Sequence, residues 1–377
     1  MIKTKETNRM IKNLPNRRIV LLLGGTMILL VLALAACAGA EGPAGPQGPA
    51  GPTGPQGPAG PPGPSAAEAM PAERSFSLGI TDNAGEPKNG VPLLTLSFED
   101  GTPDATTVIA KKGTPVVDGE DGDEAWGPPS GLELLPFNGG GGPSTATIKA
   151  AYDDHNIYFL VTWEDPTGTE SIHKKMWTYD AATDSWSQAQ NEDRVYFLWN
   201  INATEFNEGG CTLYCHLGDS NWEQADSKMG TNSPGDRVDV WHWKSARTNP
   251  VGHADDKYWS DLTGAGVIIY EGEQVFRTRL GDSGTGFDSD NIEQDLPAFM
   301  HANDPGANPD FLMDYEAVEF APEADWADGD TIPGYVLKRG TGSRADVVSA
   351  ATYTDGTWVL ELKRSLTTYN TDDIQFK

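Results

Sequence analysis

Short stretches in which apolar and polar residues alternate recur from about residue 104 to the end of the chain. The clearest is NIYFLVTWED (156–165), where every second residue from Ile157 to Trp163 is apolar. Alternation with a period of two is typical of a β-strand with one face in a core. Similar runs, separated by turns rich in Gly, Asp and Asn, predict strands at 106–110, 146–152, 157–163, 194–200, 238–244, 267–270, 275–280 and 358–363.

Long helical periodicity is nearly absent, so the pattern predicts an all-β fold, a β-sandwich with long loops between its strands. The connection over 201–265 is too long for a hairpin loop, and long insertions in compact domains are usually functional. We expect the domain to cover 104–377 and to continue beyond Lys377, because TDDIQFK reads as the start of a further strand. Residues 66–103, which include a strand-like run at 93–98, are interpreted as a linker or the start of the domain.

The first 36 residues differ in kind from the rest. Six basic residues precede an apolar stretch, 19–36, that ends in small residues, as a secretory signal does. The sequence Leu34-Ala35-Ala36-Cys37 matches a bacterial lipobox. We therefore predict a lipoprotein signal over 1–36, acylation of Cys37 and an extracytoplasmic chain held on a membrane. A plain transmembrane anchor is the alternative, with the same location for the remainder.

A collagen-like repeat follows the predicted lipid anchor. Residues 42–65 form eight Gly-X-Y triplets with Pro at nearly every X position. Glycine at every third position lets three polyproline II chains pack at a common axis. Residues 37–65 are thus predicted to be a lipidated stalk, which either joins three chains in a homotrimer or acts as a stiff monomeric spacer.

The formal net charge of the chain is −28, and removal of the basic leader brings it to −33. So acidic a surface repels nucleic acid and anionic lipid head groups, which excludes both as partners. It suits solubility at high salt, cation binding or docking to a basic redox partner.

Cys211 and Cys215 are the two cysteines besides Cys37, and His216 follows directly. Two thiols at short spacing can bond both vinyl groups of one haem, and a histidine after the second thiol can bind the iron from below. The usual spacing is two residues, whereas three separate these cysteines. A Cys211–Cys215 disulfide is the alternative in an oxidising compartment.

The segment 227–259 brings further candidate ligands. Met229 offers a thioether as the sixth iron ligand, and His242 or Lys244, on one face of the strand predicted at 238–244, could replace it. Trp241 and Trp243 fall on the other face, as core or lid residues. Cations suited to pairing with haem propionates are Arg237, Arg247 and Lys257.

An acidic run at 118–124 could bind Ca²⁺, but it lacks the full spacing of a calcium loop. We interpret it as a charged turn between strands.

Five blocks of this sequence resemble the ethylbenzene dehydrogenase-related haem-binding domain, which also forms the haem subunit of dimethylsulfide dehydrogenase-type enzymes. They are TPVVDGEDGDEAW (114–126), ATIKAAYDDHNIYFLVTWEDPT (146–167), EDRVYFLWNI (192–201), GGCTLYCH (209–216) and TNSPGDRVDVWHWKSARTNPVGHADDKYW (231–259). The resemblance implies a β-sandwich that holds one haem between its loops. Founding members bind haem b through Met and Lys ligands, but the Cys-x-x-x-Cys-His segment resembles the c-type branch of the family. His216 then takes the place of the lysine.

Two functions follow from these observations. The first is a membrane-anchored cytochrome that transfers electrons through one haem, c-type rather than b-type, with no catalysis of its own. It would act as a free-standing carrier or as the haem subunit of a molybdenum oxidoreductase. The second is a carbohydrate-binding surface lipoprotein with a Cys211–Cys215 disulfide, no haem and an aromatic platform at 241–259.

Overall fold

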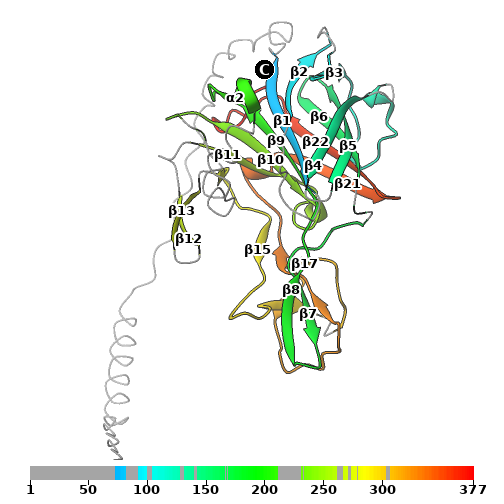
Figure 1. The fold of residues 1–377 in the computed structure, drawn as a ribbon, viewed down its shortest axis with the longest axis vertical. Coiled ribbons are helices and arrows are strands. Elements are labelled where there is room, and N and C mark those ends of the chain that lie inside the picture. The colour runs from blue at the N-terminus through cyan, green and yellow to red at the C-terminus, as the bar shows by residue number, and fades with distance from the viewer. Residues whose placement is uncertain are drawn as a thin grey trace, which may run out of the picture. The chain divides into compact units, whose positions relative to one another are not determined.

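The predicted leader (1–36), Cys37 and the predicted stalk (37–65) lie outside the residues that the structure describes. The computed structural model describes residues 73–81, 92–99, 104–127, 131–139, 142–165, 167, 169–210, 231, 233–260, 266–270, 273–277, 279–302 and 306–377 (Figure 1). Within these ranges no helix has the length and apolar character needed to cross a bilayer.

One large sheet dominates the described residues. Its strands follow the order β14-β11-β10-β9-β1-β2-β3-β5-β6-β22-β21, and β4 pairs with β5 outside this path. The strands are β1 (Arg74–Thr81), β2 (Leu93–Phe98), β3 (Thr107–Lys112), β4 (Leu132–Gly139), β5 (Gly142–Tyr152), β6 (Asn156–Glu164), β9 (Arg194–Asn200), β10 (Val238–Lys244), β11 (Asp255–Trp259), β14 (Arg279–Gly281), β21 (Val348–Thr354) and β22 (Thr357–Ser365).

The two ends of this sheet pack face to face over a common core: β9 and β10 on one side face β6 and β22 on the other. Phe159 of β6 lies 5.9 Å from Trp241 of β10 between ring centroids, although five strands separate β6 from β10 in the sheet. Trp243 of β10 likewise lies 5.2 Å from Trp358 of β22. We call the surface toward this core the inner face and the opposite surface the outer face.

Alternation along β6 explains its place in the core. Ile157, Phe159 and Val161 are buried in the inner core, whereas Tyr158 and Leu160 pack on the outer side with Trp126. The indole of Trp126, in the 3-10 helix η3 (Glu124–Trp126), donates to Glu361 Oε1 of β22 at 2.9 Å. The loop before η3 therefore covers the outer face of β6 and β22.

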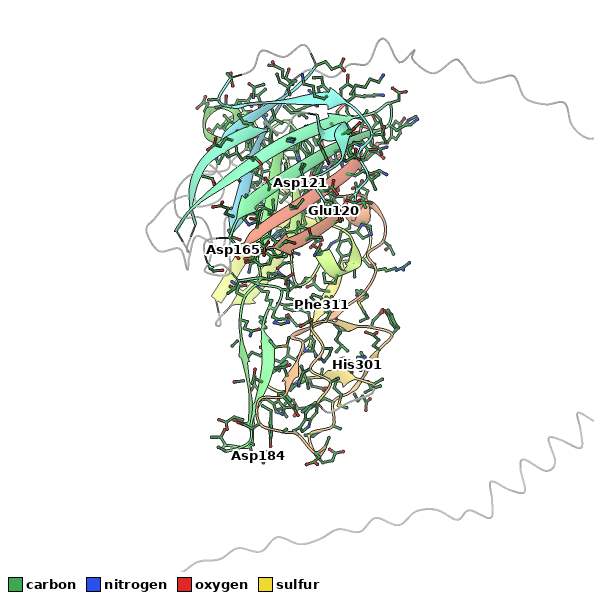
Figure 2. All side chains as sticks on the ribbon, turned by 90° about the vertical axis from the view of Figure 1, so that its right-hand side faces the viewer. Glu120, Asp121, Asp165, Asp184, His301 and Phe311 are labelled. Atoms are coloured by element: carbon green, nitrogen blue, oxygen red, sulfur yellow. The ribbon has the colours of Figure 1, made fainter. Side chains whose placement is uncertain are left out.

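That covering loop contains the acidic run at 118–124. The backbone N–H groups of Asp118 and Gly119 donate to Glu361 Oε2, and Asp123 accepts from Val116 and Ala125. Glu120 and Asp121 point to solvent beside β22 (Figure 2). These contacts are those of a charged turn.

Smaller sheets are formed by two parts of the sequence, the part between β6 and β9 and the part after β14. They comprise β7 (Met176–Asp180), β8 (Ser185–Ala189), β15 (Asp288–Asp290), β16 (Phe299–His301), β17 (Leu312–Met313), β18 (Ala317–Glu319), β19 (Thr331–Ile332) and β20 (Tyr335–Leu337). Trp177, Met300 and Ile332 form their own small core, and Asp184 marks the far end of the β7–β8 hairpin (Figure 2).

The remaining elements are short. They are α2 (Phe206–Gly209), the hairpin β12 (Gly266–Tyr270) and β13 (Glu273–Arg277), and the 3-10 helices η6 (Asn249–Val251) and η8 (Ser343–Ala345). The all-β prediction is confirmed, and each strand predicted from the sequence coincides with an observed strand. The run 275–280 is divided between β13 and β14.

Candidate functional site

The outer face of β9, β10 and β11 carries an apolar cluster at the end where β10 begins. Leu198, Val238, Val240 and Trp259 form it, together with Ala203 and Phe206 from the segment around α2. We call this cluster the outer patch. Alternation places these residues here, because the intervening side chains of β9 and β10, such as Trp199 and Trp241, face the inner core.

The segment that contains the cysteines begins and ends at the border of the outer patch. Gly210 lies against Ser77 of β1 and Leu93 of β2, and Leu93 itself packs on the patch. At the other end, Thr231 N donates to the carbonyl of Ser260, the residue after Trp259, at 3.0 Å. The stretch of sequence between Gly210 and Thr231 lies outside the described residues. It contains Cys211, Cys215, His216 and Met229.

His242 lies on the same outer face as Val238 and Val240. Its imidazole is buried and meets the ring of Tyr196 edge to face, with 6.2 Å between ring centroids. Lys244, two residues further along β10, continues this face.

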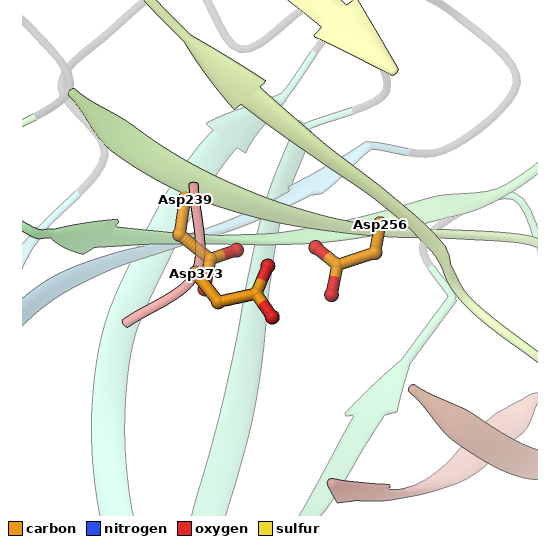
Figure 3. A group of neighbouring side chains, drawn as sticks. All are labelled: Asp239, Asp256 and Asp373. Carbon is orange, nitrogen blue, oxygen red and sulfur yellow. The ribbon is translucent and has the colours of Figure 1, made fainter. Parts of the chain in front are cut away.

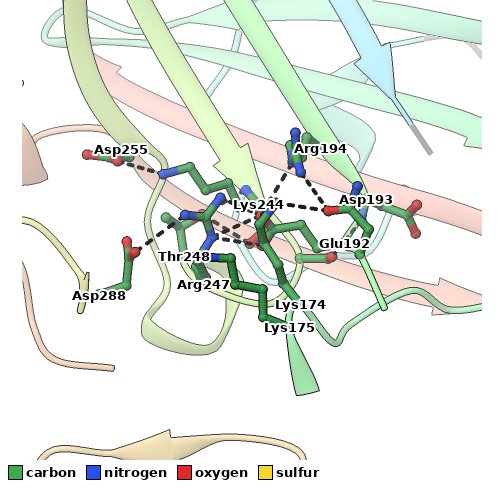
Figure 4. Close-up of polar contacts among 12 residues, drawn as sticks. Lys174, Lys175, Glu192, Asp193, Arg194, Lys244, Arg247, Thr248, Asp255 and Asp288 are labelled. Atoms are coloured by element: carbon green, nitrogen blue, oxygen red, sulfur yellow. Dashed lines mark hydrogen bonds and ion pairs between the residues drawn. The ribbon is translucent and has the colours of Figure 1, made fainter. Parts of the chain in front are cut away.

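Lys244 is buried in an ion pair. Its Nζ lies 2.7 Å from Asp255 Oδ2 (Figure 4). Lys257 Nζ and Arg344 Nε lie 2.8 and 2.7 Å from the same carboxylate. Burial favours the neutral form of Asp255, but the three cations outweigh it and hold the pKa of this carboxyl well below its usual range. Lys257, predicted to face a haem propionate, thus pairs with Asp255 in the described structure.

Arg247 belongs to a neighbouring network around Glu192. Its Nε donates to Glu192 Oε1 at 2.9 Å, and its Nη1 lies 3.4 Å from Asp288 Oδ2 (Figure 4). Burial disfavours the charge of Glu192, yet Arg247 and then Arg194 lower the pKa of this carboxyl overall. The sequence predicted neither acidic partner, because both lie far from Arg247 along the chain.

Arg237 stands apart from these networks. Its guanidinium carbon lies 5.4 Å from the ring centroid of Tyr258, and Nη1 donates to Thr371 Oγ1 at 3.1 Å. The side chain is half-buried at the start of β10, next to the outer patch.

Trp241 and Trp243 have no exposed surface. Both lie in the inner core, and Trp259 is buried in the outer patch. The interpretation of Trp241 and Trp243 as core residues is confirmed, and these three rings do not form an exposed platform for a sugar.

A second polar site was not anticipated from the sequence. Asp239, Asp256 and Asp373 are buried together on the inner side of β10 and β11, with carboxylates that point toward one another (Figure 3). The sequence did contain an indication of this site. Asp239 is two and four residues from Trp241 and Trp243 along the same strand, so its side chain points to the same face as these core residues. An aspartate at an inward position of a core strand needs a partner of opposite charge.

The described residues define an all-β domain in which Gly210 and Thr231, the residues that flank the cysteine-containing segment, lie at the border of a buried apolar cluster. Compared with protein families, residues 111–377 match the family described as ethylbenzene dehydrogenase. The chain belongs to this family. No curated protein matches it.

Proposed function

We propose that this chain is an extracytoplasmic, lipid-anchored cytochrome that transfers electrons through one haem attached at Cys211 and Cys215, with His216 as an iron ligand. The observation that supports this most is where the two flanking residues lie: Gly210, directly before Cys211, and Thr231 both contact residues at the border of the outer patch. Haem needs an apolar surface for its ring and cations for its propionates. The outer patch supplies buried apolar side chains at the border of that segment, and Arg237 is the cation next to the patch.

The donor set fits an iron porphyrin. Two thiols and an imidazole are the groups that covalent haem attachment requires, and Met229 would be the sixth ligand. When bound, haem supplies a one-electron couple, and the chain positions it and limits its access to water. His242 and Lys244 are the alternatives to Met229, and Lys244 would have to leave Asp255 in order to bind iron.

We infer that the cytochrome exchanges electrons with another protein and has no substrate chemistry of its own. Its family takes its name from an oxidoreductase, which supports a redox partner of the molybdenum oxidoreductase class. The predicted lipid anchor and stalk favour a free-standing carrier at the membrane, because a subunit held by its partners needs neither.

The test is to produce the full chain in cells that attach haem to cytochromes c, as wild type and as His216→Ala. We expect the wild type to gain the mass of one haem and to show a sharp reduced α band, which the alanine variant loses or shifts. His155→Ala is the matched control, because His155 is exposed in a turn between β5 and β6.

A colourless wild-type protein whose Cys211 and Cys215 form a disulfide would overturn the proposal. That outcome would favour the carbohydrate-binding lipoprotein, with a platform other than the buried tryptophans of β10. A red protein that releases its haem into acidified organic solvent would instead show b-type binding and remove the role of the two cysteines.

A further inference from the structure

A cluster of aspartates lies on the inner side of the sheet edge, on the opposite face from the outer patch. Asp239 of β10 and Asp256 of β11 are diagonal neighbours, since Trp241 is the register partner of Asp256. Asp373 comes from the C-terminal segment, and its neighbour Ile374 donates its N–H to Asp239 Oδ2 at 2.8 Å. Asp282 follows β14 and donates its N–H to the Asp256 carbonyl.

These carboxylates can converge on one point. Asp239, Asp256 and Asp373 each offer an oxygen, and the three atoms lie within 4.8 Å of one another. Asp282, Asp372 and Asp373 form a second such group, so Asp373 is common to both. Oxygens bound to one Ca²⁺ at 2.3–2.6 Å are at most about 5 Å apart, which this spacing satisfies.

The positive charge within the described cluster comes from Arg364. Its Nη1 lies 2.7 Å from Asp239 Oδ2 and 3.5 Å from Asp256 Oδ2. Its guanidinium also lies over the ring of Trp241, 4.6 Å from the centroid, and Nη2 donates to the carbonyl of Ile374. One arginine cannot neutralise four buried carboxylates.

Several oxygens in the cluster accept no hydrogen bond from the described residues. They are Oδ1 of Asp239, Asp256 and Asp373 and both carboxylate oxygens of Asp282, whose side chain is fully or almost fully buried in each case. Asp256 has no exposed surface and Asp282 only 4 %. Buried ionised oxygens without donors are very costly unless a cation binds them.

We propose that this cluster binds a hard divalent cation of the Ca²⁺ type, with Asp239, Asp256 and Asp373 as ligands. The adjoining group of Asp282, Asp372 and Asp373 offers a second position. All the donors are carboxylate oxygens, which Ca²⁺ prefers, and no thiol or imidazole of the described residues joins them. The half-buried Asp372 provides an approach from solvent. The ion would fasten the C-terminal segment to the edge strands β10 and β11.

The test uses the full mature chain, stripped of metal with EGTA and then supplied with CaCl₂. We expect one or two Ca²⁺ ions per chain by elemental analysis after dialysis, and a rise in Tm of roughly 5 °C or more at saturating Ca²⁺. MgCl₂ at the same concentration should raise Tm less, because Mg²⁺ requires a smaller and more regular ligand set.

The variant Asp256→Asn distinguishes a cation site from a group of buried, protonated carboxyl groups that bind no ion. With Ca²⁺ present, this variant should melt below the wild type, whereas in EGTA it should melt above it, because one unpaired buried charge is gone. Asp121→Asn, a matched change at an exposed position, should follow the wild type in both buffers. If Asp256→Asn does not fold, Asp373→Asn and the wild-type titration provide the same comparison.

The proposal fails if the stripped wild type binds no Ca²⁺ and its Tm does not respond to CaCl₂. An Asp256→Asn variant more stable than the wild type in both buffers would likewise show protonated carboxyls in place of a cation site. An equal rise in Tm with Mg²⁺ would contradict the assignment to Ca²⁺.

Discussion

Lys174 lies at the edge of the ion-pair network around Glu192, where its Nζ donates to Asn191 Oδ1 at 2.9 Å and lies 3.8 Å from Glu192 Oε1. Burial, followed by the positive charge of Arg194, lowers the pKa of this ammonium to about 7. Glu192 already faces Arg247 and Arg194, so a third cation gains little from it. The folded protein therefore favours neutral Lys174 at a pH where an unfolded chain keeps it charged.

The lowered pKa of Lys174 determines how its contribution to the free energy of unfolding changes with pH. Between pH 7 and about 10 the unfolded state binds more protons at this lysine than the folded state does, so the contribution of Lys174 to stability rises with pH. We predict that Lys174→Met gains stability relative to the wild type at pH 7 and loses that advantage by pH 9.5. Urea unfolding at both pH values measures it. Lys175→Met, a change at the exposed neighbouring residue, is the control. The prediction is contradicted if the two variants differ in free energy of unfolding by the same amount at pH 7 and at pH 9.5.

At the scale of elements, α2 and Gly210 directly precede the segment that contains Cys211 and Cys215. Gly210 has φ 58° and ψ −141°, a conformation that favours glycine, and a Cβ there would overlap Ser77 Oγ of β1. Two separate constraints therefore require glycine at this position, and both act directly before Cys211.

We predict that Gly210→Ala lowers the free energy of unfolding by about 2–4 kcal/mol and reduces the fraction of chains with haem. Gly235→Ala separates the two constraints, because Gly235 also has a positive φ but open space around its Cβ position. It should cost about 1 kcal/mol and leave the haem content unchanged. Chemical denaturation and the ratio of haem to protein absorbance provide the two readouts, and equal effects of the two substitutions would contradict this account.

The strands that the sequence predicted are those with strong alternation or long apolar runs, such as β6, β9 and β22. β11 escaped prediction because its outward residues, Asp255 and Lys257, form ion pairs, and its inward Asp256 lies in the acidic cluster. β1 has a clear alternation of Phe76, Leu78 and Ile80, but the flanking Pro-, Gly- and Ala-rich sequence concealed it. Strand order also stayed beyond prediction, since it depends on contacts between distant segments.

The candidate site, like the fold, contains some residues that the sequence could indicate and others that it could not. Short spacing in the sequence singled out Cys211, Cys215 and His216, because the chemistry of haem attachment is local. These residues lie outside the described residues, so their role stays a prediction. Acidic partners such as Glu192 and Asp255 could not be assigned, because the sheet register brings them to their cations. The aspartate cluster joins residues from four segments, and only the inward parity of Asp239 indicated it.

At the scale of the whole molecule, the segment 366–377 packs into the core. Phe376 has no exposed surface, lies 5.1 Å from Trp199 and 6.0 Å from Trp241 between ring centroids, and stacks near Arg364. Tyr369, in the same segment, is 89 % exposed. The segment therefore contributes through a few inward residues.

We predict that Phe376→Ala lowers the free energy of unfolding by ~3–5 kcal/mol, because it leaves a cavity among large aromatic side chains. Tyr369→Ala should change it by less than about 0.5 kcal/mol, since that ring contacts mainly solvent. Guanidinium unfolding followed by tryptophan fluorescence measures both. A loss for Phe376→Ala as small as that for Tyr369→Ala would mean that the segment does not close the core.

The pairing of β1 with β9 joins Phe76 to Trp199, and Phe376 packs on the same tryptophan. The contact order of this domain is therefore high, and loop closure over such distances makes folding slow. In the exported chain that we propose, this core cannot form until Phe376 has crossed the membrane. We expect the Cys-x-x-x-Cys-His segment to stay accessible to the haem-attaching machinery throughout that delay.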